Sequence, residues 1–267
     1  MTDFPGSSTP LRTRSWFAEE RPLLHLITVF VFLLLLGFWQ WGFPAAGWIA
    51  AKLTPAPVAS ALDERTLHAL DGKFFEPSQL SGDRQEQITQ AFMKILQQAK
   101  IKDVQPRILF RHAVSAPQSA FALPGGTIIV TDTLIDATQN DGELLGVLAH
   151  ELALIATGEP LRIFFTSLAW PTLSYIVTRN TSSVFEAAET EASLNLHPVY
   201  PARLRGETDT RAVDLLLAVG ENPTAFADLH ERISTAINGQ MRLAAANLID
   251  VERLSAIRAY AARRATH

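Results

Sequence analysis

The most restrictive feature of this sequence is an uncharged apolar run near its start. The segment PLLHLITVFVFLLLLGFWQWGF covers residues 22–43, and only His25 and Thr28 interrupt its first part. About 20 such residues suffice for a helix to cross the hydrocarbon core of a bilayer. Tryptophans, which favour the membrane–water interface, cluster at the far end of the run: Trp39, Trp41 and Trp48. We therefore expect one transmembrane helix over residues 22–43.

Two other interpretations of this run fit less well. A cleaved signal peptide has an apolar core of roughly 7–15 residues, and this run is longer and follows residues 1–21. A buried core helix normally keeps one polar face, which this run lacks. Three arginines precede the run, at positions 12, 14 and 21, whereas Lys52 is the one nearby cation after it. The positive-inside rule then predicts a cytoplasmic N-terminus and a main domain outside the cytoplasm, which is the periplasm if the source is a Gram-negative bacterium.

These signals divide the chain into four parts. We expect a cytoplasmic tail over 1–21, the anchor over 22–43, a proline-rich linker over 44–61 and a folded domain over 62–267. A net charge of −4 gives no indication of nucleic-acid binding. The absence of cysteine excludes thiol catalysis, disulfides and cysteine-ligated zinc.

Periodicity predicts the elements of the domain. GDRQEQITQAFMKILQQAK has a helical apolar stripe, and PRILFRH and TIIVT are typical of strands. Pro124–Gly126 predicts a tight turn and therefore a hairpin. In GELLGVLAHELALIATGEP, Asn140 and Glu143 have the spacing of a capping box, and Gly158 is placed to end the helix. The run over 161–177 is expected to be a buried or membrane-touching helix, and the chain after residue 183 to be mostly helical.

The helix over residues 142–157 carries an incomplete metal-binding pattern. Histidines four residues apart share a helical face and can bind one zinc ion, and a glutamate after the first can take a proton from zinc-bound water. His150 and Glu151 fit this pattern, but the fifth position is Leu154, which has no lone pair. A catalytic zinc needs three protein ligands, so the remaining ligands would have to come from elsewhere.

The run SAFALPGGTIIVTDTLIDATQNDGELLGVLAHEL, residues 119–152, resembles the HtpX-type zinc metallopeptidases. Members typically have N-A-F-A-L-P-G-G, a strand, and a helix with A-H-E-x-x-H. Weaker similarity extends from Leu62 to the C-terminus, and one bacterial branch also has a single N-terminal anchor. The resemblance implies a zincin-like α+β domain, mostly helical with a small antiparallel sheet, and a zinc endopeptidase acting on exported or membrane proteins.

The resemblance also shows where this chain departs from the family pattern. The second ligand histidine falls on Leu154. The third ligand, a glutamate in E-x-x-A-D, falls on Thr210, with Asp214 as the aspartate; a further site histidine falls on Asn247. Glu207 and Asp209 lie close to Thr210, so a shifted ligand is conceivable. Of the other histidines, at positions 25, 68, 112, 197, 230 and 267, His112 is the best-placed substitute because it ends a strand near SAFALPGG.

The substrate-facing parts are better preserved. In the family, the strand after ALPGG edges the cleft and a peptide can add to it as a further strand. The corresponding residues are Ala122, Leu123, Pro124, Gly125, Gly126, Thr127, Ile128 and Ile129. We therefore predict a membrane-anchored pseudoprotease that binds polypeptide or a protein partner, with Glu151 vestigial. The alternative is an active zinc endopeptidase with His150 as ligand, Glu151 as base and a rearranged ligand set.

Overall fold

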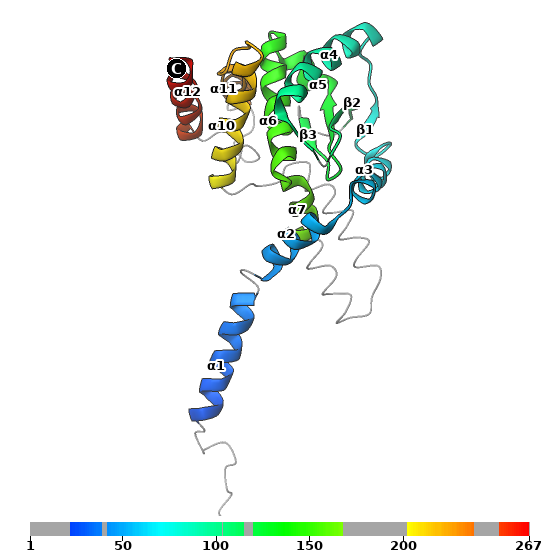
Figure 1. Cartoon of the computed structure of the whole chain (residues 1–267). Helices are drawn as coiled ribbons and strands as arrows, with labels where there is room; N and C mark the ends of the chain where they lie inside the picture. Colours follow the sequence, from blue (N-terminus) through cyan, green and yellow to red (C-terminus); the bar gives the residue numbers. More distant parts are fainter. Residues whose placement is uncertain are drawn as a thin grey trace, which may run out of the picture. The chain divides into compact units, whose positions relative to one another are not determined.

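The computed structural model describes residues 22–38, 42–102, 104–114, 120–167, 202–237 and 251–266 (Figure 1). The chain divides into two compact units, residues 1–43 and 44–267. In the first unit, helix α1 (Pro22–Gly37) contains the apolar stretch His25–Leu34. Within the described ranges, no single helix is both long and apolar enough to cross a membrane. One pair of consecutive helices, Asp141–Thr157 and Glu159–Ser167, is long and apolar enough when taken together, by length and composition only, and is bent by 66°.

The second unit begins with two helices in the segment that was expected to be a linker. Helix α2 (Phe43–Leu53) starts at the unit boundary, and α3 (Ala56–Leu70) follows after two residues. The prolines do not prevent this, because Pro55 is the N-cap of α3 and Pro57 lies in its first turn. The unit continues with β1 (Phe75–Pro77) and α4 (Gly82–Ala99). Of the apolar stripe predicted for α4, Ile88, Phe92 and Ile95 are buried and Leu96 is half-buried.

A four-stranded sheet follows, in the order β1-β2-β4-β3. Strands β2 (Arg107–Ala113) and β4 (Thr127–Thr131) match the two predicted strands, and β3 (Ala120–Ala122) forms the predicted hairpin with β4. The sheet is mixed, however, because β2 and β4 are parallel. After β2 the chain forms β3 at the edge of the sheet. Strand β4 then returns antiparallel to β3 and lies between β3 and β2. The prediction of an antiparallel sheet was therefore wrong.

Helices cover the rest of the unit. They are α5 (Asp132–Ala137), α6 (Asp141–Thr157), α7 (Glu159–Ser167), α10 (Ala202–Ala218), α11 (Ala225–Ile237) and α12 (Val251–Ala265). Residues 168–177 of the predicted second apolar helix and the predicted helix over 184–194 lie outside the described residues.

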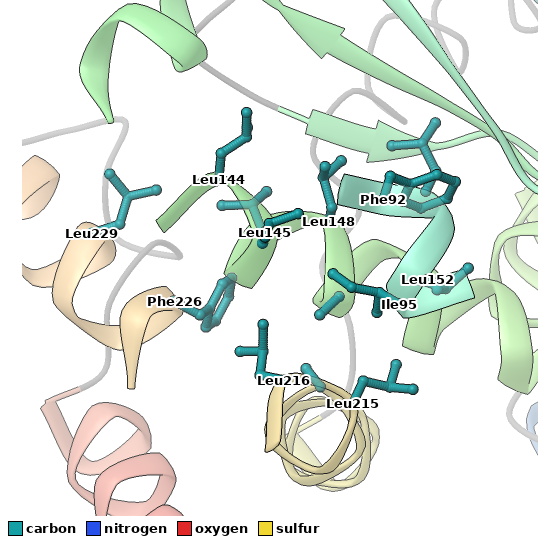
Figure 2. Close-up of a cluster of buried hydrophobic side chains, with 14 of the residues drawn as sticks. Phe92, Ile95, Leu144, Leu145, Leu148, Leu152, Leu215, Leu216, Phe226 and Leu229 are labelled. Atoms are coloured by element: carbon teal, nitrogen blue, oxygen red, sulfur yellow. The ribbon is translucent and has the colours of Figure 1, made fainter. Parts of the chain in front are cut away.

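Helix α6 is the centre of the core. All its residues from Glu143 to Ile155 are buried. Figure 2 shows Leu144, Leu145 and Leu148 of α6 between side chains of neighbouring helices: Phe92 and Ile95 of α4, Leu215 and Leu216 of α10, and Phe226 and Leu229 of α11. A helix buried on several sides fixes the direction of each of its side chains, which matters because this helix carries His150 and Glu151.

Candidate functional site

Local chemistry fixes both ends of α6. The Asn140 side chain accepts a hydrogen bond from the amide of Glu143 at 3.0 Å, and the Glu143 carboxylate accepts one from the amide of Gln139 at 2.8 Å. Asn140 therefore caps the helix as predicted, but the predicted capping box is shifted, because Glu143 accepts from the residue before the N-cap and not from the N-cap itself. Glu143 also pairs with Arg232 of α11. Gly158 ends the helix with φ of 74°, as predicted.

A close approach between helices brings α11 to the same part of α6. A Cβ built on Gly146 would lie 2.7 Å from the backbone nitrogen of Phe226. Glycine is therefore required here, because any larger residue would push α11 away. One turn further along α6, the ring of His150 stacks on the ring of Phe226, with centroids 4.7 Å apart and an interplanar angle of 15°.

The partner of His150 is an ion pair formed by two other helices. Its Nδ1 lies 3.1 Å from Oδ1 of Asp209 on α10. Asp209 accepts two hydrogen bonds from Arg253 of α12, one from Nε and one from Nη2, both at 2.7 Å. The Arg253 guanidinium also lies 5.4 Å from the centre of the Phe226 ring. We call His150, Asp209, Phe226 and Arg253 the four-helix cluster, since each comes from a different helix.

Burial decides the charges in this cluster. Burial lowers the pKa of His150, although Asp209 opposes the shift. Burial alone would raise the pKa of Asp209, but the hydrogen bonds from Arg253 and the nearby His150 ring lower it to about 2. His230 packs against Phe226 from α11, and burial together with the nearby Arg253 lowers its pKa to about 3. At neutral pH the imidazoles of His150 and of the adjacent His230 are therefore uncharged and lie beside an Asp209–Arg253 ion pair.

Glu151 faces the sheet. Its carboxyl oxygen Oε2 accepts a hydrogen bond from the backbone amide of Ala122 on β3 at 2.9 Å. Burial raises the pKa of Glu151 to about 8, against the opposing effects of the Ala122 hydrogen bond and of Arg253. A carboxyl with this pKa is mostly protonated at pH 7, so most Glu151 side chains would have to lose a proton before they could act as a base.

These residues do not fit a catalytic zinc ion. Leu154 is 1% exposed and offers no lone pair, and the Thr210 hydroxyl donates to the carbonyl of Glu207. The Asp209 carboxylate is already bound to a guanidinium, which would repel a metal ion. Across the part of the chain that the structure describes, no group of three or more His, Asp or Glu side chains is arranged to hold a metal.

The position of Asp209 changes the register of the family pattern on α10. Asp214 lies away from the cluster and interacts with Tyr260 and Arg264 instead. If Asp209 is the aspartate of E-x-x-A-D, the ligand position four residues earlier is Arg205, not Thr210. Figure 1 shows α6 and α10 running in opposite directions. Because His150 lies beside Asp209, Leu154 one turn later on α6 and Arg205 one turn earlier on α10 fall at the same level. We infer that Arg205 takes the place of the third ligand.

Other predicted candidates lie elsewhere. Nδ1 of His112, on β2, lies 3.5 Å from Oδ2 of the buried Asp132 and makes no hydrogen bond in the described part of the chain. His25 and His68 are exposed on α1 and α3, and Asn247, His197 and His267 lie outside the described residues. Sequence reasoning missed the role of Arg253 and His230. His230 follows Phe226 by four residues, and on a helix this spacing predicts that the two rings are in contact.

The predicted substrate groove is differently arranged. Strand β4 is not at the edge of the sheet: it pairs on both sides, and all its residues are buried. The edge strand on this side is β3. The amides of Gly125 and Thr127 donate to the buried carboxylate of Asp63 on α3, at 2.6 and 2.9 Å. The two hydrogen bonds to Asp63 therefore hold the ALPGG turn in place.

Comparison with known proteins agrees with the sequence resemblance. A model of Peptidase family M48 matches residues 82–261, which run from the start of α4 into α12. No curated protein matches the chain. The match includes every member of the four-helix cluster as well as the AHEL motif, and it confirms the predicted family, while the single-anchor branch stays a prediction. The chain therefore belongs to this family of peptidases.

Proposed function

We propose that this protein is a membrane-anchored pseudoprotease that binds polypeptide without cleaving it. The observation that carries the proposal is the guanidinium of Arg253, which is bound to Asp209 beside His150. A zinc peptidase needs a doubly charged cation at its histidine ligands to polarise the substrate carbonyl and to activate water. Here a protein cation lies beside the histidine instead, and the side chain that should supply the second imidazole is Leu154.

The state of Glu151 supports the same conclusion. A general base must be ionised when it takes up a proton. Burial raises the pKa of Glu151 to about 8, so without a metal ion beside it the carboxyl is mostly protonated at neutral pH, and it is bound to the Ala122 amide. The apolar run over 22–43 supports the anchor, and the arginines before it support a cytoplasmic N-terminus with the domain outside the cytoplasm.

A second candidate is an active zinc endopeptidase with a rearranged site. One observation favours it: His150 and Asp209 are within 3.1 Å of each other, so they could serve as two ligands if Arg253 moved away. In that case Glu151 would remain the base, and its pKa would fall once a metal ion lay beside it.

Zinc content of the full-length protein in detergent micelles separates the two candidates. We expect far less than one zinc per chain after purification without chelator and dialysis against zinc. We also expect no cleavage of a fluorescein-labelled unfolded polypeptide, and no change in binding of that polypeptide when Glu151→Gln is introduced. About one zinc per chain, lost in His150→Ala, together with cleavage that Glu151→Gln abolishes, would establish the active peptidase.

A further inference from the structure

Helix α2 carries three large apolar side chains that are exposed. Trp48, Ile49 and Leu53 are 50%, 49% and 75% exposed. Their spacing places them on one side of the helix, together with the exposed Ala45. A contiguous apolar patch on a folded domain marks a surface that contacts another molecule or a membrane.

The opposite side of α2 is fixed by packing on α7. Gly47 is buried there, and Ala50 and Ala51 are half-buried. A Cβ built on Gly47 would meet the side chain of Thr166 and lie 3.2 Å from its backbone nitrogen, so α7 lies close against this side of α2 (Figure 1). Because of this contact, α2 cannot turn its exposed apolar residues inward without separating from α7.

The charge pattern distinguishes α2 from a helix of the same unit that faces water. The exposed positions of α4 are mostly charged or amide side chains. Lys52, by contrast, is the one lysine, arginine, aspartate or glutamate between Arg21 and Asp63. Its ammonium group lies 3.9 Å from the centre of the Trp48 ring. Lysine and tryptophan both suit the membrane–water interface, because each has an apolar body and a polar end.

The continuity of the chain favours lipid over a protein partner at this face. The apolar run over 22–43 ends at Phe43, which is the first residue of α2. Within the proposed function, on which this step rests, the anchor leaves the bilayer at this residue, so α2 begins at the lipid headgroups. A protein partner would have to displace lipid that is always within reach of this helix.

We infer that α2 lies in the membrane–water interface, with the side chains of Trp48, Ile49 and Leu53 among the headgroups and upper acyl chains. An interfacial helix binds through the apolar area that it buries, and a lysine on it can reach the lipid phosphates. Since α7 packs on the other side of α2, this contact gives the domain a second attachment to the bilayer besides the anchor.

Fluorescence quenching in the full-length protein tests the inference. The chain has no cysteine, so Ile49→Cys and Met93→Cys each provide a single position for a nitrobenzoxadiazole label. The positions are matched, because both residues are apolar, lie on helices of the same unit and are 49% and 44% exposed. Each labelled protein is reconstituted in phosphatidylcholine nanodiscs. The two quenchers are iodide in the water and phosphatidylcholine with a nitroxide high on its acyl chain.

An interfacial helix lies with its apolar face about 5–10 Å into the boundary between headgroups and acyl chains. We therefore expect the lipid nitroxide to quench more than half of the fluorescence at position 49 and iodide to quench little of it. Position 93 should show the reverse. Leu53→Cys, on the same face of α2, should repeat the result of position 49, and circular dichroism should show all three variants to be folded.

Two results would overturn the interfacial contact. Iodide quenching at position 49 as strong as at position 93 would show that α2 faces water. Protection of position 49 from both quenchers would show that protein covers this face. Loss of the protein from the nanodiscs during gel filtration would instead overturn the anchor over 22–43, and the contact with it. The failure of the contact alone is therefore distinguishable from the failure of the anchor.

Discussion

Oδ1 of Asp209 lies 3.1 Å from Nδ1 of His150, and both Asp209 oxygens accept hydrogen bonds from Arg253. Asp209→Asn would leave the Arg253 guanidinium, of which 17% is exposed, without its counter-charge. Loss of one partner of a buried ion pair costs about 3–5 kcal/mol. We expect a decrease of this size in the free energy of unfolding, measured by urea titration of the full-length protein in micelles.

Asp214→Asn is the control for this variant. Asp214 is on the same helix, but its pair with Arg264 is 40% and 52% exposed. Exposed pairs contribute about 1 kcal/mol or less. Equal losses in the two variants would mean that the four-helix cluster does not stabilise the domain.

The raised pKa of Glu151 makes stability depend on pH. Its pKa is about 8 in the folded protein and 4.5 ordinarily, so the folded state holds the proton over a pH range in which the unfolded state releases it. The contribution of Glu151 to the free energy of unfolding therefore falls as pH rises from about 4.5 to about 8. Glu151→Gln removes this dependence, and the variant should gain about 3–5 kcal/mol relative to wild type between pH 5 and pH 8. Urea titrations at both pH values measure it.

The buried histidines act in the opposite direction. The pKa of His230 falls from 6.5 to about 3, so the unfolded state takes up a proton below pH 6.5 that the folded state rejects. The free energy of unfolding therefore decreases as pH falls below 6.5. Glu151→Gln should leave this decrease unchanged. A constant difference between variant and wild type across pH 5–8 would contradict the placement of Glu151 as a protonated group.

Restoring metal ligands tests the register on α10. Leu154→His combined with Arg205→Glu should bind about one zinc per chain, because it completes a two-histidine, one-carboxylate set and removes a nearby cation. Leu154→His combined with Thr210→Glu should bind none, since the position after Asp209 is rotated by about 100° on the helix. Zinc content after gel filtration measures both. Uptake by the Thr210 variant alone would restore the original register.

Two glycines in helices offer a direct test of the packing. A Cβ on Gly146 would lie 2.7 Å from the Phe226 amide nitrogen, whereas a Cβ on Gly206 would meet nothing within 4 Å. Gly146→Ala should therefore destabilise the domain by about 1–3 kcal/mol through overpacking. Gly206→Ala should stabilise it by roughly 0.5–1 kcal/mol, because alanine favours the helix. Thermal unfolding gives both signs, and a stable Gly146→Ala protein would show that α11 is not tightly packed on α6.

The features predicted correctly from sequence are those set by neighbouring residues. The caps of α6 at Asn140 and Gly158 and the buried stripe of α4 depend on spacings of three or four positions. The features that were missed join distant segments. Nothing near Arg253 in the sequence indicates that it binds Asp209, 44 residues earlier. The parallel pairing of β2 and β4 likewise depends on where β3 is placed, which no local pattern specifies.

The length of β3 limits how this protein can hold a polypeptide. The strand has three residues and pairs with β4 on one side. On its other side the amide of Ala122 is already bound to Glu151. A peptide added at this edge would gain only a few main-chain hydrogen bonds, each contributing about 0.5–1.5 kcal/mol. Strand addition alone would therefore give weak contact that does not depend on the sequence of the polypeptide.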